Sequence, residues 1–454
     1  MKAGVRIRRV RAALAALAVA VALISFILTR EPESGAGPLE RQAEAFVGLA
    51  LSLGQQRAQE VDAYFGPSAL ASRGKSDGAD LAGLLRRSQS LRADIEAEEV
   101  PSLRLSRLRD QVRSFSALVE VLNAPGQRDF DDEAQQIYGM APVVADAAGS
   151  TEALQTLEAL LPGTGSLAMR VATFRNQFIV PAERRKAVFE RALHECRTRT
   201  LAKWNLPANE KLDIVWTRDV PAAWHRYEGN AHSTLKLNAA AVSFLGSAID
   251  VACHEGYPGH HAQFVVMDAS AGAKGPAVED TVVLLRSPIS MLREGAATYG
   301  VELAFSSEER LAFERDVLFP LAGLDPSHAE KYARVHRLVD ELSANVVPIL
   351  RDYRDKRLVR ELASRALESR ALVSSPESLL RFVDELGPYV LGYTVARDRV
   401  RGYIEAQAHE SGEDRWVLLH AMLAQADVSP LGRAGPAAKT STARLQQGAG
   451  KTLR

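Results

Sequence analysis

Apolar residues recur at spacings of three and four positions, with charged residues between them, over most of this chain. Leu81, Leu84, Leu85 and Leu91 form one such stripe within residues 39–205. Because a helix completes a turn about every 3.6 residues, this spacing predicts a series of amphipathic helices. The same spacing returns after residue 240 and continues to Gln425.

Two segments near the middle alternate apolar and polar residues with a period of two. Residues 212–217 and 233–238 show this alternation, and Pro221 and Gly229 interrupt the path between them. The alternation predicts two short strands. We therefore expect a mainly α fold with one small β-sheet, in one large domain or two closely packed lobes over residues 39–428. Residues 429–454 lack a periodic apolar face and are predicted to form a flexible tail.

The N-terminus carries a basic segment followed by an apolar one. Five Lys and Arg residues precede 18 uncharged residues, 12–29. This run exceeds the ~7–15 residues of a secretory signal core and reaches the ~17–25 that span a bilayer. We expect residues 1–30 to form a membrane anchor with the body outside the cytoplasm, and residues 31–38 to form a linker. A cleaved signal segment and a buried N-terminal helix remain alternatives.

Composition and charge exclude several classes of protein. Hydrophobic residues make up 46% of the chain and charged residues 25%, which is typical of a packed globular protein. The 56 Lys and Arg residues balance 56 Asp and Glu residues, so no overall basic field favours a nucleic-acid partner. With only Cys196 and Cys253, a Cys-rich metal cluster is excluded. We expect Cys253 to be a buried apolar thiol, and a Cys196–Cys253 disulfide remains possible.

A dense group of metal-binding residue types lies at residues 253–261. Catalytic zinc sites commonly use two imidazoles and one carboxylate and leave a position open for water. In the common zinc-peptidase helix the two histidines are four residues apart, but here Pro258 stands four residues after His254. On a regular helix, His261 would share a face with His254 at ~10.5 Å along the axis, and His260 would be nearer but on the wrong side.

Pro258 and Gly259 together predict a bulge or break in this helix. Proline lacks an amide proton and glycine permits unusual backbone dihedrals. Such a break would redirect the next histidine, which favours His260 as the second ligand and leaves His261 as the alternative. Glu294 begins a small-residue helical stretch whose backbone can approach another helix closely. We expect Glu294 to be the third ligand.

These residues resemble a known bacterial family. His254–His261 followed by Gln263, and then Glu294–Tyr299, are similar to the motifs of the domain-of-unknown-function 885 family. The resemblance covers residues 40–425 but is specific only across 250–302. It implies an often exported, mainly helical zinc metallopeptidase, similar to the gluzincins, in which two histidines and a downstream glutamate hold Zn²⁺. Ala296 departs from the family, which more often has Trp there.

The resemblance and the residue chemistry imply a division of roles. His254, His260 and Glu294 would bind Zn²⁺, and Glu255 would act as general base toward the activated water. Tyr389 or Tyr393, in a Tyr-x-x-Gly element of the family, would donate a hydrogen bond to the oxyanion.

The remaining expected roles concern orientation and substrate. His261 and Gln263 would orient the ligands, and the strand at 233–238 would pair with an extended substrate. Asn238 and Arg399 are expected to contact the substrate, by resemblance to elements that the family carries.

The predicted function is a zinc-dependent hydrolase, a metallopeptidase acting on peptides in the cell envelope. Two alternatives remain open: an inactive membrane-anchored scaffold that binds a partner, and an amidase or esterase acting on cell-wall fragments. The same activated water attacks all of these carbonyl groups, so the motif does not choose between bonds.

Overall fold

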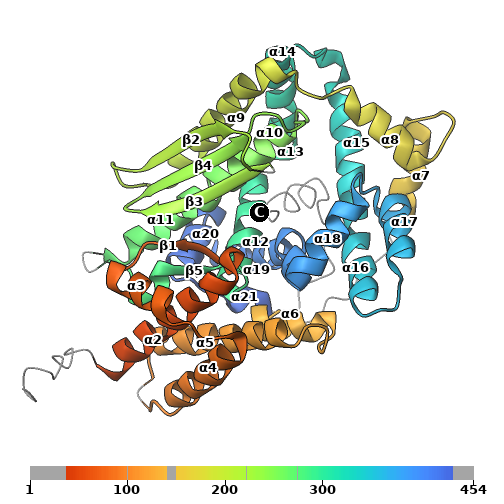
Figure 1. Cartoon of the computed structure of the whole chain (residues 1–454). Coiled ribbons are helices and arrows are strands. Elements are labelled where there is room, and N and C mark those ends of the chain that lie inside the picture. Colours follow the sequence, from red (N-terminus) through yellow and green to blue (C-terminus); the bar gives the residue numbers. More distant parts are fainter. Residues whose placement is uncertain (1–36, 100, 141–149, 221, 273–274, 433–454) are drawn as a thin grey trace, which may run out of the picture.

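The computed structural model describes residues 37–432, apart from residues 100, 141–149, 221 and 273–274. The fold is mainly helical, as predicted, and the described residues form two small sheets where one was expected (Figure 1). The predicted anchor at residues 1–30, most of the linker and most of the tail lie outside the described residues. No helix within the described part of the chain is both long enough and apolar enough to cross a bilayer.

The N-terminal helices pack together at the lower side of Figure 1. Their ends follow local capping rules: Asp80 accepts a hydrogen bond from the Gly83 amide at 2.7 Å and so begins α4. Leu84 and Leu91 of the predicted stripe are buried on the inner face of that helix. The N-terminal helices are α2 (Pro38–Gln56), α3 (Ser68–Ser76), α4 (Leu81–Glu96), α5 (Leu103–Asn123) and α6 (Phe130–Tyr138).

The main sheet has three strands, one more than predicted. Strands β2 (Lys211–Thr217) and β4 (His232–Asn238) match the two expected segments, and β3 (Ala223–Gly229) lies between them in sequence. The strand order is β2-β4-β3, with β4 parallel to β2 and antiparallel to β3. Because β4 is central and paired on both sides, it has no free edge for a substrate strand. The expectation that residues 233–238 pair with substrate is therefore wrong.

A second, two-stranded sheet joins distant parts of the chain. Strand β1 (Val61–Tyr64) pairs antiparallel with β5 (Val282–Leu284). Beside it, the Arg286 Nε donates a 3.0 Å hydrogen bond to buried Glu60. This connection holds the N-terminal helices against the start of α12 (Pro288–Ala304).

Helix α12 lies near the middle of the molecule in Figure 1. Helix α19 (Val395–Ser411) packs along α12, and α9 (Arg185–Leu201) packs against the segment that carries His254. The other helices are α7 (Ser150–Leu160), α8 (Leu167–Asn176), α10 (Ser247–Val251), α11 (His260–Ser270), α13 (Ser307–Phe313), α14 (Phe319–Ala322), α15 (Ala329–Glu341), α16 (Val346–Arg354), α17 (Arg360–Ala371), α18 (Pro376–Leu386), α20 (Arg415–Ala424) and α21 (Ser429–Gly432).

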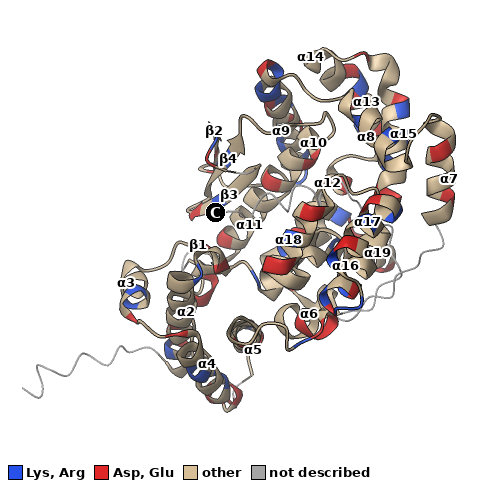
Figure 2. Ribbon diagram, turned by 45° about the vertical axis from the view of Figure 1, so that its right-hand side comes forward, with Lys and Arg blue, Asp and Glu red and all other residues tan. Residues whose placement is uncertain are grey.

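The larger of the two hydrophobic clusters formed by the described residues includes residues from Ala43 to Leu431. The predicted tail therefore begins too early, because Pro430 and Leu431 in α21 are buried against the body. Charged residues of both signs are interspersed along the helices (Figure 2).

The two cysteines form a disulfide. Cys196 of α9 is bonded to Cys253, whereas we expected a free thiol at Cys253. The expectation was wrong because the sequence does not reveal that α9 packs directly against residues 252–256.

Candidate metal centre

The helix that carries His254 is interrupted where the proline and glycine predicted a break. After α10 the backbone forms a π-helix, Ala252–Gly256, and Tyr257 is extended at φ −135° and ψ 122°. A new helix, α11, then starts at His260. Gly259 allows this turn because a Cβ there would lie only 1.8 Å from the His254 carbonyl oxygen. The break brings His260 beside His254.

Three predicted ligands converge on one buried point. His254 Nε2 lies 3.3 Å from Glu294 Oε2, and His260 Nε2 lies 3.4 Å from Glu294 Oε1. One ligand atom from each residue falls within 4.8 Å of the others, and all three residues are buried. Two imidazole nitrogens and one carboxylate are the donor set of catalytic zinc sites. The residues therefore fit zinc by donor type and by their convergence.

Small residues place Glu294 in this group. A Cβ on Gly295 would come within 2.6 Å of the Ala396 backbone, so only glycine permits this approach of α12 to α19. On the neighbouring turn, the 3₁₀-helix Gly387–Tyr393 packs Gly392 against the Glu294 side chain. The expected close approach of the small-residue stretch to another helix is present.

Neighbouring hydroxyl groups orient the candidate ligands. Tyr389 donates a 2.9 Å hydrogen bond to Glu294 Oε1, and its own hydroxyl lies 3.5 Å from Ser290. Burial raises the pKa of Tyr389 well above its usual value, so the phenol stays protonated and donates. Thr298 Oγ1 lies 3.4 Å from His254 Nδ1, on the side of the ring opposite Glu294. Sequence reasoning did not single out Thr298, although it follows Glu294 by four residues and so shares its helix face.

His261 belongs to a different cluster, which we call the Glu210 cluster: Glu210, Ser233, Tyr257 and His261. His261 Nδ1 lies 2.8 Å from Ser233 Oγ, and its Nε2 lies 2.7 Å from Glu210 Oε1. Tyr257 donates to the same carboxylate, and Arg197 donates to Oε2 at 2.8 Å. His261, the alternative ligand, therefore lies outside the group of candidate ligands, and these bonds do not connect it to them.

Electrostatics in the Glu210 cluster favour a charged glutamate and a neutral histidine. Burial by itself would raise the pKa of Glu210, but hydrogen bonds from His261, Tyr257 and Arg197 outweigh it and lower that pKa to about 2. Burial lowers the pKa of His261 more than Glu210 raises it. The cluster fixes the break to β4 and to the start of β2.

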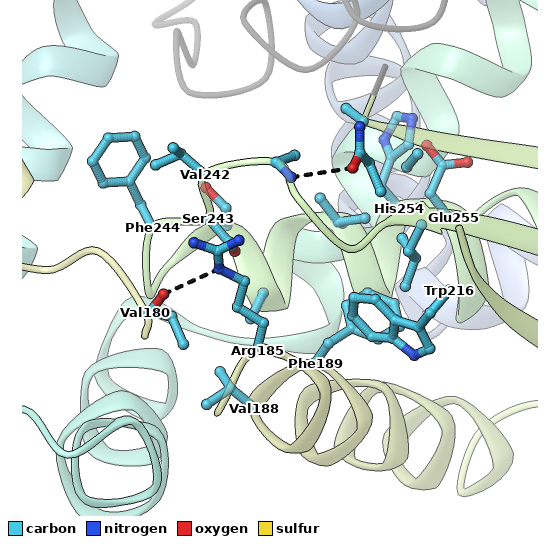
Figure 3. Close-up of a pocket in the computed structure, with 18 of the residues that line it drawn as sticks. Val180, Arg185, Val188, Phe189, Trp216, Val242, Ser243, Phe244, His254 and Glu255 are labelled. Atoms are coloured by element: carbon cyan, nitrogen blue, oxygen red, sulfur yellow. Dashed lines mark hydrogen bonds between the residues drawn. The ribbon is translucent and has the colours of Figure 1, made fainter. Parts of the chain in front are cut away.

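Glu255 lies beside the candidate ligands and faces a pocket. It lines a cavity of about 320 Å³ together with His254 and Tyr393 (Figure 3). The Tyr393 ring centroid lies 6.1 Å from that of His254. Tyr393 therefore lies at the cavity next to His254, whereas Tyr389 is hydrogen-bonded to Glu294.

The structure places the other predicted residues as follows. Asn238 lines the cavity, but its side-chain nitrogen donates to the Val220 carbonyl at 2.6 Å and its side-chain oxygen accepts from the Ala240 amide at 2.8 Å, which shapes the turn. Arg399 is buried, donates to the Leu431 carbonyl and is not among the residues that line the cavity. Its expected substrate contact is not supported by this position.

Gln263 is fully buried in α11. Within the described part of the chain, its amide group has no hydrogen-bond partner. Its expected role in orienting a ligand therefore has no contact to support it. His225 of β3, which sequence reasoning missed, lies with its ring centroid 6.0 Å from that of His260.

Known proteins give little information about the chemistry of this site. No protein-family model matches this chain, and no curated protein matches it. A solved structure from Colwellia psychrerythraea, named "putative lipoprotein", is similar with a TM-score of 0.48 and 14% sequence identity. The match covers 83% of this chain and 68% of that chain.

Proposed function

We propose that this protein is a zinc-dependent hydrolase that cleaves peptide bonds. The observation that carries the proposal is the convergence of His254, His260 and Glu294 at one buried point. Glu255 follows the first ligand directly and lines the adjoining cavity with it. A metal site next to a carboxylate and an open cavity is the arrangement that hydrolysis requires.

Each residue has a definite role in this proposal. Bound zinc would supply a water of lowered pKa and would polarise the scissile carbonyl. Glu255 accepts the proton of that water and later delivers it to the leaving amine. Tyr393 donates a hydrogen bond to the carbonyl oxygen as negative charge develops there. Tyr389 keeps Glu294 oriented and is a positioning residue, because its hydroxyl is already bonded to that carboxylate.

The cavity supports an enzyme over an inactive scaffold. His254, Glu255 and Tyr393 all line it, so the candidate catalytic residues border a space that a small ligand could enter. An amidase or esterase acting on cell-wall fragments would use the same groups, and the cleavage products distinguish it from a peptidase. We further propose that the protein belongs to the domain-of-unknown-function 885 family and works in the cell envelope, on the basis of the motifs and the N-terminal segment.

Replacing Glu255 with Gln tests the proposal most directly. We expect the purified protein to bind zinc near one per chain, by mass spectrometry, and to hydrolyse a mixed peptide library in a chelator-sensitive way. Glu255→Gln removes the proton acceptor, so turnover should fall by about 10²–10⁴-fold while zinc stays bound.

The control for this experiment is Glu195→Gln. Glu195 also follows a histidine, but it lies on α9 and pairs with Arg191 and Arg199. This variant should keep wild-type turnover. Zinc at one per chain without hydrolysis of any peptide would instead favour the scaffold, and full activity of Glu255→Gln would remove Glu255 as the base.

A further inference from the structure

The cavity beside His254 and Glu255 carries an unusual distribution of charge. Arg175 and Arg185 line it, and among the described residues that line it Glu255 is the only acid. Neither arginine has a carboxylate within 4.0 Å in the described part of the chain, whereas Arg191 and Arg197 of α9 pair with Glu195 and Glu210. Among the described residues, therefore, no carboxylate forms an ion pair with either guanidinium of this wall.

The two guanidinium groups are held in place by neutral partners. Arg185 Nε donates to the Val180 carbonyl at 3.2 Å, and its Nη1 donates to the Ala239 carbonyl at 3.4 Å. The Arg175 guanidinium lies 4.8 Å from the centre of the Phe244 ring. These contacts fix the positions of the groups but leave donor capacity, because a guanidinium has five N–H donors.

The rest of the cavity wall is largely apolar. In Figure 3, His254 and Glu255 lie at one side of the cavity, and the Arg185 guanidinium lies beside Val180 and Ser243 on the other. Apolar side chains fill the wall between and around these groups: Val180, Val188, Phe189, Trp216, Val242 and Phe244. Val242 is 62% exposed, so an apolar group entering the cavity would cover it.

We propose that this cavity binds the end of the substrate that bears a carboxylate. An apolar group would occupy the wall around Phe189 and Trp216, and the carboxylate would accept hydrogen bonds from Arg185 and Arg175. Guanidinium groups bind carboxylates well because their fork of donors matches both oxygens. This inference rests on the proposed function for the reaction, but the binding itself does not require turnover.

A free C-terminus and an acidic side chain would both supply such a carboxylate. Two matched pairs of probes separate these sources. The first pair is N-acetyl-leucyl-phenylalanine as the free acid and as the amide. The second pair is N-acetyl-leucyl-phenylalanyl-glutamic acid amide and its glutamine analogue, which differ only in the charge of the side chain.

Binding is measured by calorimetry on zinc-loaded Glu255→Gln protein, so that no probe is consumed. We expect the charged member of at least one pair to bind about tenfold more tightly than its neutral partner. A ratio of this size is typical of hydrogen bonds between a charged carboxylate and a guanidinium group. Arg185→Met and Arg175→Met, each in the Glu255→Gln background, should bring that ratio close to one. Arg175→Met keeps the test valid if loss of Arg185 disturbs the turn at Val180 and Ala239.

Arg184→Met is the matched control. Arg184 precedes Arg185, is exposed and donates to the Leu321 carbonyl, and it does not line the cavity. This variant should keep the full preference for the charged probe. The ratio should also fall with rising salt concentration.

The outcomes separate this inference from the proposed function. Equal binding within both pairs, or no binding of any probe, overturns the inference even if the wild-type protein hydrolyses peptides. A charge preference that disappears in Arg185→Met or Arg175→Met, but persists in Arg184→Met, supports it. The same result together with no hydrolysis of any peptide would support the binding site and contradict the proposed hydrolase.

Discussion

Two buried clusters of histidine and glutamate lie next to each other in this protein, and they differ in how their polar atoms are satisfied. In the Glu210 cluster, both nitrogens of His261 have partners, at 2.8 and 2.7 Å. In the candidate metal centre, two histidines direct their Nε2 atoms at one carboxylate, at 3.3 and 3.4 Å. These separations exceed ordinary hydrogen bonds and suit ligands that surround a common ion.

The comparison shows that burial and residue type alone do not distinguish a metal site. Adjacent residues on a helix point ~100° apart, so the break at Tyr257–Gly259 directs His260 to Glu294 and His261 to Glu210. The distinguishing feature is the convergence of several donors on a single point beside an open cavity. In the Glu210 cluster, by contrast, the histidine nitrogens and the carboxylate oxygens bond to one another, to Ser233 and Tyr257, and to Arg197.

Replacing each of the adjacent histidines gives the largest expected contrast. His260→Ala should lower zinc content from near one per chain to near zero and reduce hydrolysis by more than about 10³-fold, because both the metal and its activated water are lost. His261→Ala should keep zinc but lower the free energy of unfolding by about 1–3 kcal/mol, since the buried Glu210 loses a partner. Zinc analysis and urea unfolding measure the two effects. Loss of zinc in His261→Ala together with retention in His260→Ala would reverse the assignment.

We expect reduction of the disulfide to give the next largest effect. The bond links segments that carry residues of both clusters. Cys196–Cys253 ties α9, which carries Arg197, to the turn that carries His254, across 57 residues of sequence. Reducing it in the metal-free protein should lower the free energy of unfolding by about 2–4 kcal/mol. Thermal unfolding with and without reductant measures this loss. In the Cys196→Ser/Cys253→Ser double variant the reductant should have no effect, and an unchanged wild-type melting temperature would argue against the bond.

Tyr389→Phe tests how the candidate metal centre is supported. This change removes the 2.9 Å hydrogen bond to Glu294 while keeping the ring. Zinc affinity, measured by competition with a chelator, should fall by about 10- to 100-fold. Tyr257→Phe is the matched change in the Glu210 cluster, and it should leave zinc affinity unchanged. Equal losses in the two variants would mean that the clusters are not independent.

The smallest effect concerns acid pH and the Glu210 cluster alone. The pKa of Glu210 is about 2 in the folded protein and 4.5 ordinarily. Because the folded-state pKa is the lower one, Glu210 contributes stability above pH 4.5, and this contribution is lost as the pH falls toward about 2. The difference in unfolding free energy between metal-free wild type and Glu210→Gln should therefore shrink over this range, in urea titrations at pH 7, 4 and 3. A difference that does not change with pH would contradict the lowered pKa.

Sequence patterns predicted more of the local structure than of the long-range pairing. The helical spacing, β2 and β4, and the break before His260 are all present, because each depends on residues close together in the chain. Strand β3 was missed since its inward positions include His225, which weakens the apolar alternation. The central position of β4 depends on which strands pair with it, and alternation within one segment carries no such information.

For the candidate site too, the residue types were predicted from the sequence, but the partners far away in the chain were not. The proposed roles of His254, Glu255, His260 and Glu294 were predicted from their residue types and from the resemblance of their motifs to a known family. In contrast, Glu210 and His261 are 51 residues apart, and Cys196 and Cys253 are 57 apart. Nothing in the local sequence around Glu210 or Cys196 marks either one as a partner of the segment at residues 253–261.

The sequence alone determined that the chain is mainly helical, that a proline and a glycine break one helix between histidines, and that a carboxylate follows on a helix of small residues. These properties are set by backbone preferences and by the spacing of residues within a few turns. Only the tertiary structure decided which histidine faces Glu294, which tyrosine supports that carboxylate, and where two arginines meet an apolar cavity. Those outcomes depend on packing between segments far apart in the chain. The relative placement of the helices, rather than residue type, sets the distances between their side chains.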